Sequence, residues 1–251
     1  MGIEYNPFSL EDKTILVTGA SSGIGMATAI ECSKMGARLI ITGRNEERLQ
    51  DTLNQLEGNE HQMIVADLVN ENEIRSLVDK VPVLDGVVLS TGRVSSIPIL
   101  FATREKFNPI FDINFFSPIE LFRLLVKSKR IAKDSSVVFI VSIGGTEAFT
   151  PGGAIYGASK AALNSMISYC AIEFAPKKIR VNGICPGMVE TPLIHDGIIS
   201  ETQMKADKER YLMKRYGNPE DVAYAAIYLL SDASSWMTGQ SIIIDGGITV
   251  R

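Results

Sequence analysis

Short apolar runs alternate with longer amphipathic stretches along most of this chain. Such runs are typical of buried strands, and strands that alternate with helix-length segments are typical of a parallel sheet. We therefore predict an α/β fold with a seven-stranded, mainly parallel, doubly wound sheet and helices on both faces. The predicted strands are residues 13–17, 37–42, 61–66, 84–89, 136–141, 179–184 and 240–244.

Two amphipathic intervals are long enough to predict extended helices. Residues 103–132 predict one long helix, or two pieces that meet near Pro109 and Pro118, and residues 154–175 predict another. Polar residues interrupt the periodicity from about 192 to 215. This predicts a loose segment, which in an enzyme is a candidate lid.

Composition narrows the class of protein. The 251 residues are 45% hydrophobic and 22% charged, which are globular values, and we expect a single domain over residues 1–251. No apolar run is long enough to span a bilayer, and the first residues do not resemble a signal peptide, so we expect a cytoplasmic location and no membrane partner. A net charge of -4 without a basic cluster argues against a nucleic-acid partner.

The candidates for metal binding are few. The three cysteines, Cys32, Cys170 and Cys185, lie far apart, which predicts neither a disulfide framework nor a zinc site. His61 and His195 are also far apart, without cysteine or carboxylate neighbours at ligand spacing, so we predict no metal site.

A glycine-rich stretch at residues 18–25 follows the first predicted strand and opens a helical pattern. Gly19 would allow the tight turn, Gly23 a close approach to a pyrophosphate, and Gly25 packing of the helix against the strand. The alternative is an ordinary turn between a strand and a helix. The position in the first strand–helix unit favours a dinucleotide and a Rossmann-type domain.

Two residues bear on which dinucleotide binds. Arg44 ends the second strand, where an arginine accommodates the 2′-phosphate of NADP(H). The alternative is a solvated charge near Glu46 and Glu47, with NAD(H) as the cofactor. Asp67 follows the third strand and would either accept a hydrogen bond from adenine or cap the helix predicted at residues 70–78.

A second group of residues indicates acid–base chemistry. Tyr156 and Lys160 are four apart in a predicted helix and so share one face. A nearby ammonium lowers the pKa of a phenol because it favours the phenolate. Ser142 ends the fifth predicted strand, at the edge where such folds place catalytic groups. The alternatives are a surface pair and an ordinary loop hydroxyl.

These motifs, in this order, resemble the short-chain dehydrogenase/reductase family over essentially the whole chain. Residues 18–25 are similar to its TGxxxGxG loop, and Ser142, Tyr156 and Lys160 to its serine and YxxxK group. Asn114 resembles the fourth catalytic residue of the family. Residues 217–223 and 238–247 look like the 3-oxoacyl-[acyl-carrier-protein] reductase branch.

The resemblance implies an NAD(P)(H)-dependent oxidoreductase that transfers hydride between nicotinamide and a carbonyl or secondary alcohol, such as a 3-oxoacyl thioester or a small ketone. Tyr156 would be the general acid/base, Ser142 would polarise the carbonyl, Lys160 would lower the pKa of Tyr156 and hold the ribose, and Asn114 would anchor a water. The implied cofactor-binding residues are Gly19, Ser21, Ser22, Gly23, Ile24, Gly25, Arg44, Asp67, Leu68, Tyr156, Lys160, Pro186, Gly187, Val189 and Thr191.

The chain departs from the family in two places. Leu89-Ser90-Thr91-Gly92 stands where the family usually has Asn-Asn-Ala-Gly, so we expect Ser90 and Thr91 to supply part of the missing hydrogen bonds. Ser22 stands where many reductases of the branch carry a basic residue. The departure leaves an alternative function open, a nucleotide-binding redox sensor with little turnover.

The sequence says less about partners and substrate. Phe149, Pro151, Met188 and Ile194 predict an apolar pocket wall, which suits a ketone or an acyl chain. The resemblance implies a homotetramer or dimer. A basic set would either dock an acyl-carrier protein or form a solvated helix end; it comprises Arg123, Lys127, Lys129 and Arg130.

Overall fold

The computed structural model describes residues 5–194 and 201–250. Its strands form one seven-stranded sheet in the order β3-β2-β1-β4-β5-β6-β7, and every neighbouring pair is parallel. The strand order reverses between β1 and β4, which confirms the predicted doubly wound fold. The strands are β1 (Thr14–Thr18), β2 (Arg38–Gly43), β3 (Gln62–Val65), β4 (Leu84–Leu89), β5 (Ile131–Ile140), β6 (Arg180–Pro186) and β7 (Ser241–Ile244).

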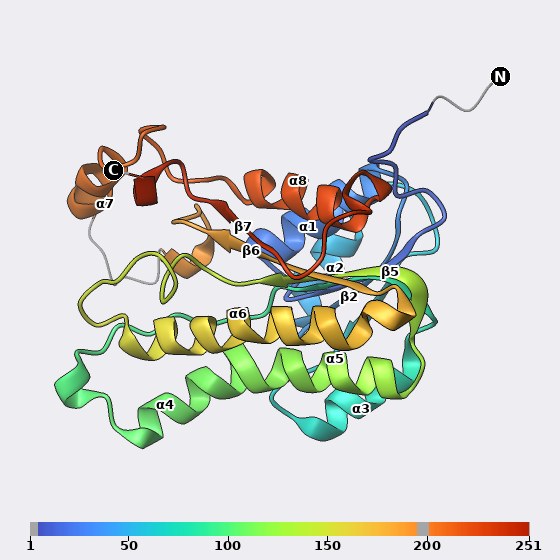
Figure 1. Cartoon of the computed structure of the whole chain (residues 1–251), viewed down its shortest axis with the longest axis horizontal. Helices are drawn as coiled ribbons and strands as arrows, with labels where there is room; N and C mark the ends of the chain where they lie inside the picture. Colours follow the sequence, from blue (N-terminus) through green and yellow to red (C-terminus); the bar gives the residue numbers. More distant parts are fainter. Residues whose placement is uncertain (1–4, 195–200, 251) are drawn as a thin grey trace.

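Helices cover both faces of the sheet (Figure 1). The helices α1 (Gly23–Lys34), α2 (Glu46–Leu53) and α8 (Pro219–Leu230) share one apolar core with the sheet. On the other face lie α3 (Glu71–Lys80), α5 (Ser117–Lys127) and α6 (Ala154–Phe174). Successive strand side chains point to opposite faces, so Ile15 joins the first core and Leu16 the second.

Strand β5 begins at Ile131, earlier than predicted. Its pairing with β4 shifts register between Leu84 and Gly86, and Asp134 has a left-handed φ of 64°. Lys133 and Asp134 are therefore exposed in the irregular part of the strand. The first half of β5 therefore lacks the apolar pattern from which a strand is predicted.

The long helical interval contains a π-helical turn. Residues 112–116 form this turn between α4 (Arg104–Phe111) and α5. The two pieces therefore meet between Pro109 and Pro118 rather than at either proline. The turn buries Asn114 completely, whereas Phe116 stays exposed.

The predicted loose segment contains a helix, α7 (Glu201–Lys208), within its described part. Within the described residues, no helix is long and apolar enough to cross a membrane. All three cysteines are buried free thiols. Short 3₁₀ turns occur at Ile99–Phe101, Ala175–Lys177, Pro192–Ile194, Asp232–Ser234 and Ile248–Val250.

Candidate active site

A cleft of about 840 Å³ opens at the carboxyl ends of the strands. In doubly wound sheets this edge is the usual ligand site, and the volume lies in the range of small-molecule sites. Each residue predicted to hold a cofactor lines this cleft, as do Ser142, Tyr156 and Lys160. The fourth predicted catalytic residue, Asn114, is buried and does not line the cleft.

The glycine loop has the backbone that its sequence predicts. Gly19 and Gly23 have left-handed φ values of 66° and 54°, a region that glycine occupies without steric cost. A β-carbon at Gly25 would overlap the carbonyl group of Gly19. The first turn of α1 is thus packed directly on the glycine loop.

The start of α1 differs from the starts of the next two helices. Asn45 caps α2 by accepting from the Arg48 amide at 2.8 Å, and Asn70 caps α3 by accepting from the Asn72 amide at 3.0 Å. Ser22, at the start of α1, makes no side-chain cap. The first amides of α1 are therefore available to an anion in the cleft.

Asp67 lines the cleft and does not cap the helix that follows. Its carboxylate accepts a hydrogen bond from the Val69 amide at 3.1 Å, which closes a local turn. Because Asn70 occupies the cap position, the capping interpretation of Asp67 is wrong. Arg44 is exposed in the same part of the cleft, just before the Asn45 cap of α2.

Ser142, Tyr156 and Lys160 come together where β5 ends and α6 begins. The hydroxyl of Ser142 accepts from the Gly144 amide at 3.0 Å and hydrogen-bonds to Tyr156. Lys160 is only 4% exposed, and its ammonium donates to the Ile140 carbonyl at 2.8 Å. The strand end and the first two turns of the helix thus place a hydroxyl, a phenol and an ammonium in one corner of the cleft.

Burial sets the direction of the pKa shifts in this corner. Burial raises the pKa of Tyr156, while its hydrogen bond with Ser142 acts in the opposite direction. Burial also lowers the pKa of Lys160 from 10.5 to about 8. The net pKa of Tyr156 is therefore raised, because loss of solvent outweighs the hydrogen bond with Ser142, and a lowering of this pKa by Lys160 stays a prediction.

Asn114 ties three segments together beneath the cleft. Its side-chain oxygen accepts from the Arg93 amide at 2.8 Å, and its nitrogen donates to the Arg93 carbonyl and to the Ser159 hydroxyl, both at 3.0 Å. Ser159 in turn donates to the Tyr156 carbonyl at 2.7 Å. The side chain of Asn114 thereby fixes the segment after β4 against α6.

The altered segment after β4 is bonded to the glycine loop. Thr91 donates from its hydroxyl to the Thr18 hydroxyl at 3.0 Å, as expected of a replacement hydrogen bond. Ser90 contributes through its backbone amide, which donates to the same oxygen at 3.0 Å, rather than through its side chain. Leu89 is buried in the core, where an asparagine would need polar partners.

Part of the cleft wall was absent from the sequence prediction. Asp207 and Arg210 line it as an ion pair of 2.7 Å, and the Tyr216 hydroxyl donates to Asp207 at 3.0 Å. Tyr211 also lines it and accepts from the Met188 amide at 3.2 Å. These residues follow no motif, but Asp207, Arg210 and Tyr211 fall in the segment 192–215 that the sequence predicts to be a candidate lid.

The predicted apolar wall is mostly present. Pro151, Met188 and Ile194 line the cleft, whereas Phe149 is 80% exposed and lies outside the cleft lining. The prediction for Phe149 is wrong because its loop turns the ring to solvent.

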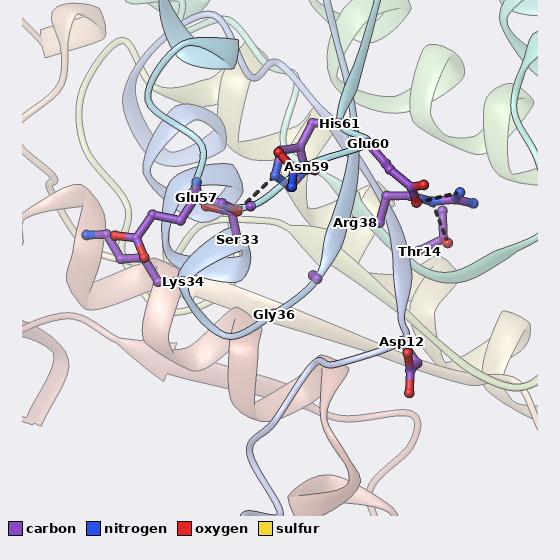
Figure 2. Close-up of a pocket in the computed structure, with 12 residues that line it drawn as sticks. Asp12, Thr14, Ser33, Lys34, Gly36, Arg38, Glu57, Asn59, Glu60 and His61 are labelled. Atoms are coloured by element: carbon purple, nitrogen blue, oxygen red, sulfur yellow. Dashed lines mark hydrogen bonds and ion pairs between the residues drawn. The ribbon is translucent and has the colours of Figure 1, made fainter.

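A second hollow of about 580 Å³ lies at the opposite, amino edge of the sheet (Figure 2). His61 accepts there from the Leu39 amide at 3.1 Å, and Ser33 accepts from the Glu57 amide at 2.9 Å.

Across the described part of the chain, no three His, Cys, Asp or Glu residues are grouped to hold a metal ion. His195 lies outside the described residues.

Known proteins with similar sequences are oxidoreductases that match nearly the whole chain. The sequence profile described as enoyl-(acyl carrier protein) reductase matches residues 19–249. The 3-oxoacyl-[acyl-carrier-protein] reductase FabG of Rickettsia prowazekii (strain Madrid E) is 36% identical over 95% of this chain and 98% of its own. The cyclopentanol dehydrogenase of Comamonas testosteroni is 30% identical over 96% of this chain and 99% of its own.

Solved structures agree with this comparison. A short chain dehydrogenase/reductase family protein superposes with a TM-score of 0.87 at 29% identity, covering 97% of this chain and 100% of its own. A dehydrogenase/reductase from Sinorhizobium meliloti 1021 gives a TM-score of 0.89 at 30% identity, covering 96% and 97%.

Proposed function

The chain belongs to the short-chain dehydrogenase/reductase family, and from this premise we propose that it is an NADP(H)-dependent reductase of a carbonyl compound. One observation carries the proposal. An uncapped, glycine-rich helix start and the Ser142, Tyr156 and Lys160 corner line the same cleft. The first feature suits a dinucleotide, and the second suits proton transfer to a carbonyl oxygen.

The residues of the cleft fit a nicotinamide dinucleotide. The free amides of α1 would take the pyrophosphate, Arg44 the 2′-phosphate and Asp67 the adenine. Lys160 would hold the nicotinamide ribose, and the segment from Pro186 to Thr191 would cover the ring. When bound, the nicotinamide supplies the hydride.

The chain itself would supply the proton. Because burial raises the pKa of Tyr156, its phenol keeps the proton at neutral pH, as a donor in carbonyl reduction requires. Ser142 would hydrogen-bond to the same carbonyl oxygen and stabilise the negative charge that forms on it. Asn114 would act as a positioning residue, because it fixes the Gly92–Arg93 backbone beside Lys160.

For the substrate, we propose a 3-oxoacyl thioester. The FabG relatives and the resemblance of the C-terminal motifs support this class. Pro151, Met188 and Ile194 would contact an acyl chain. In the basic set, Arg123 is paired with Glu120 at 2.6 Å, so Lys127, Lys129 and Arg130 are the cations that we propose for docking of an acyl-carrier protein.

We also propose that the chain is a homo-oligomer, a dimer or a tetramer. Phe116, in the π turn before α5, and Tyr169 and Ile172, on α6, are exposed. The helices α5 and α6 lie side by side in the layer that covers one face of the sheet (Figure 1). Exposed large apolar side chains are typical of an interface when they form a patch. Sedimentation of the purified protein tests this proposal.

The test of the function is an assay of a panel of 3-oxoacyl thioesters, ketones and alcohols with NADPH and with NADH, followed by absorbance of the reduced nicotinamide. We expect turnover of at least one carbonyl compound and a preference for NADPH. In Arg44→Gln the preference should fall while turnover with NADH is retained. Binding of dinucleotide without turnover of any compound would instead favour a redox sensor.

A further inference from the structure

A cation follows directly after the segment that departs from the family pattern. Arg93 comes after Gly92 and lines the cleft, with its side chain exposed. Among the described residues, its guanidinium has no hydrogen bond or ion pair. All donors of this side chain are therefore available to a ligand.

The backbone of Arg93 is rigidly held. The fully buried Asn114 side chain bonds to both its amide and its carbonyl, at 2.8 and 3.0 Å. Holding the backbone from the core reduces the conformational entropy that a ligand contact would cost. The side chain of Arg93 takes no part in these two hydrogen bonds.

The three residues before Arg93 contact two parts of the proposed cofactor site. On one side, the hydroxyls of Thr91 and Thr18 bond at 3.0 Å, and a β-carbon at Gly19 would lie 3.2 Å from the Ser90 carbonyl oxygen. On the other side, a β-carbon at Gly92 would lie 3.3 Å from the Lys160 ammonium. Arg93 thus follows a segment that contacts both the glycine loop and the ribose-binding lysine.

The glycine loop lacks a cation of its own. Residues 18–25 contain no lysine or arginine, and Ser22 occupies the uncapped helix start. A pyrophosphate there would meet amide and hydroxyl dipoles but no positively charged side chain of this loop. Arginine forms charge-assisted, often bidentate hydrogen bonds with phosphate oxygens, which are stronger than bonds from neutral amides.

We propose that Arg93 binds the pyrophosphate of the dinucleotide and supplies the positive charge that the glycine loop lacks. This inference rests on the proposed function, because it takes the cleft to be a dinucleotide site. It assigns Arg93 a different task from Arg44. Arg44, at the end of β2, would distinguish NADPH from NADH, whereas Arg93 would contact a group that both share.

Equilibrium binding tests the proposal without turnover. Isothermal titration calorimetry with NADPH and with NADH would compare the unaltered protein with Arg93→Gln, Arg93→Lys and Arg44→Gln. Arg104→Gln is the matched control, because Arg104 is exposed at the start of α4 and does not line the cleft. Circular dichroism and thermal unfolding verify that each variant folds.

We expect Arg93→Gln to weaken the binding of both dinucleotides by about the same factor, on the order of 10- to 100-fold. Arg93→Lys should restore part of the affinity, Arg104→Gln should change nothing, and Arg44→Gln should weaken NADPH alone. Unchanged affinity in Arg93→Gln, or a loss confined to NADPH, would overturn the inference. If the unaltered protein bound neither dinucleotide, the proposed function would fail, and this inference with it.

Discussion

The cleft at the carboxyl edge of the sheet and the hollow at its amino edge are both lined with polar side chains, but these side chains are bonded differently. In the hollow, His61 and Ser33 bond to backbone amides, and Arg38 donates to the Thr14 hydroxyl at 3.2 Å (Figure 2). In the cleft, buried Lys160 donates to a backbone carbonyl and pairs with no carboxylate among the described residues, and the start of α1 is uncapped.

The volume of a depression alone does not identify a functional site. Both depressions are several hundred Å³, yet the polar groups of the hollow are used to join its strands and helices. The cleft retains uncapped amides at the start of α1 and a buried lysine whose pKa is lowered by burial. Perturbed, underused groups are typical of functional sites.

The largest effect should come from Tyr156→Phe, which removes the proposed proton donor of the cleft. We expect kcat to fall by about 100- to 10,000-fold, the usual range for general acid catalysis, with dinucleotide affinity retained. Tyr224→Phe, an exposed tyrosine on α8, is the control and should be unaffected. Steady-state kinetics measures kcat of both variants. A near-normal kcat in a folded Tyr156→Phe variant would contradict the mechanism.

The second largest effect should come from Gly25→Ala. The new methyl group would overlap the carbonyl of Gly19 and force the glycine loop apart. We expect dinucleotide binding to weaken by more than about 10-fold, measured by calorimetry. Gly58→Ala in the hollow is the comparison. Its φ of 99° strains an alanine by about 1–2 kcal/mol, but dinucleotide binding should not change.

Lys160→Met tests how much the burial of the Lys160 charge destabilises the folded protein. With a folded pKa of about 8 and an ordinary value of 10.5, the unfolded chain binds more protons between these pH values, so stability rises with pH across this window. Below pH 8 the buried charge costs on the order of 3 kcal/mol, and loss of the bond to the Ile140 carbonyl offsets part of any gain.

We therefore expect Lys160→Met to be inactive but more stable than the unaltered protein at pH 7, by up to about 3 kcal/mol, with the difference shrinking toward pH 10.5. Urea unfolding at several pH values measures this. Lys133→Met, at an exposed site of β5, should show no such trend. A stability difference that is independent of pH would refute the burial argument.

The smallest effect should come from His61→Ala in the hollow. The ring accepts from the Leu39 amide and bonds to the Glu57 carbonyl at 2.9 Å, so its loss should cost about 1–2 kcal/mol of unfolding free energy. Dinucleotide affinity and kcat should stay unchanged. A variant with reduced affinity for NADPH would show that the two edges are coupled.

Local patterns were sufficient for much of the fold. The inner strands could be predicted because a buried parallel strand needs a continuous apolar run, and the partly exposed edge strands β3 and β7 still carry short apolar runs. The start of β5 was missed because its register shift depends on pairing with β4. The helix α7 was missed because its polar sequence has no apolar face to reveal it.

For the site, local sequence patterns were enough to identify which groups are present: a glycine loop after β1, and Tyr156 and Lys160 one turn apart on a helix. These follow from backbone conformation and helical spacing, which are local. The tertiary structure decided that Asn114 holds the Arg93 backbone, that Asp207 and Arg210 line the cleft, and that the pKa of Tyr156 is raised rather than lowered. Burial and bonds between distant segments produce these features, and neither exists before the chain folds.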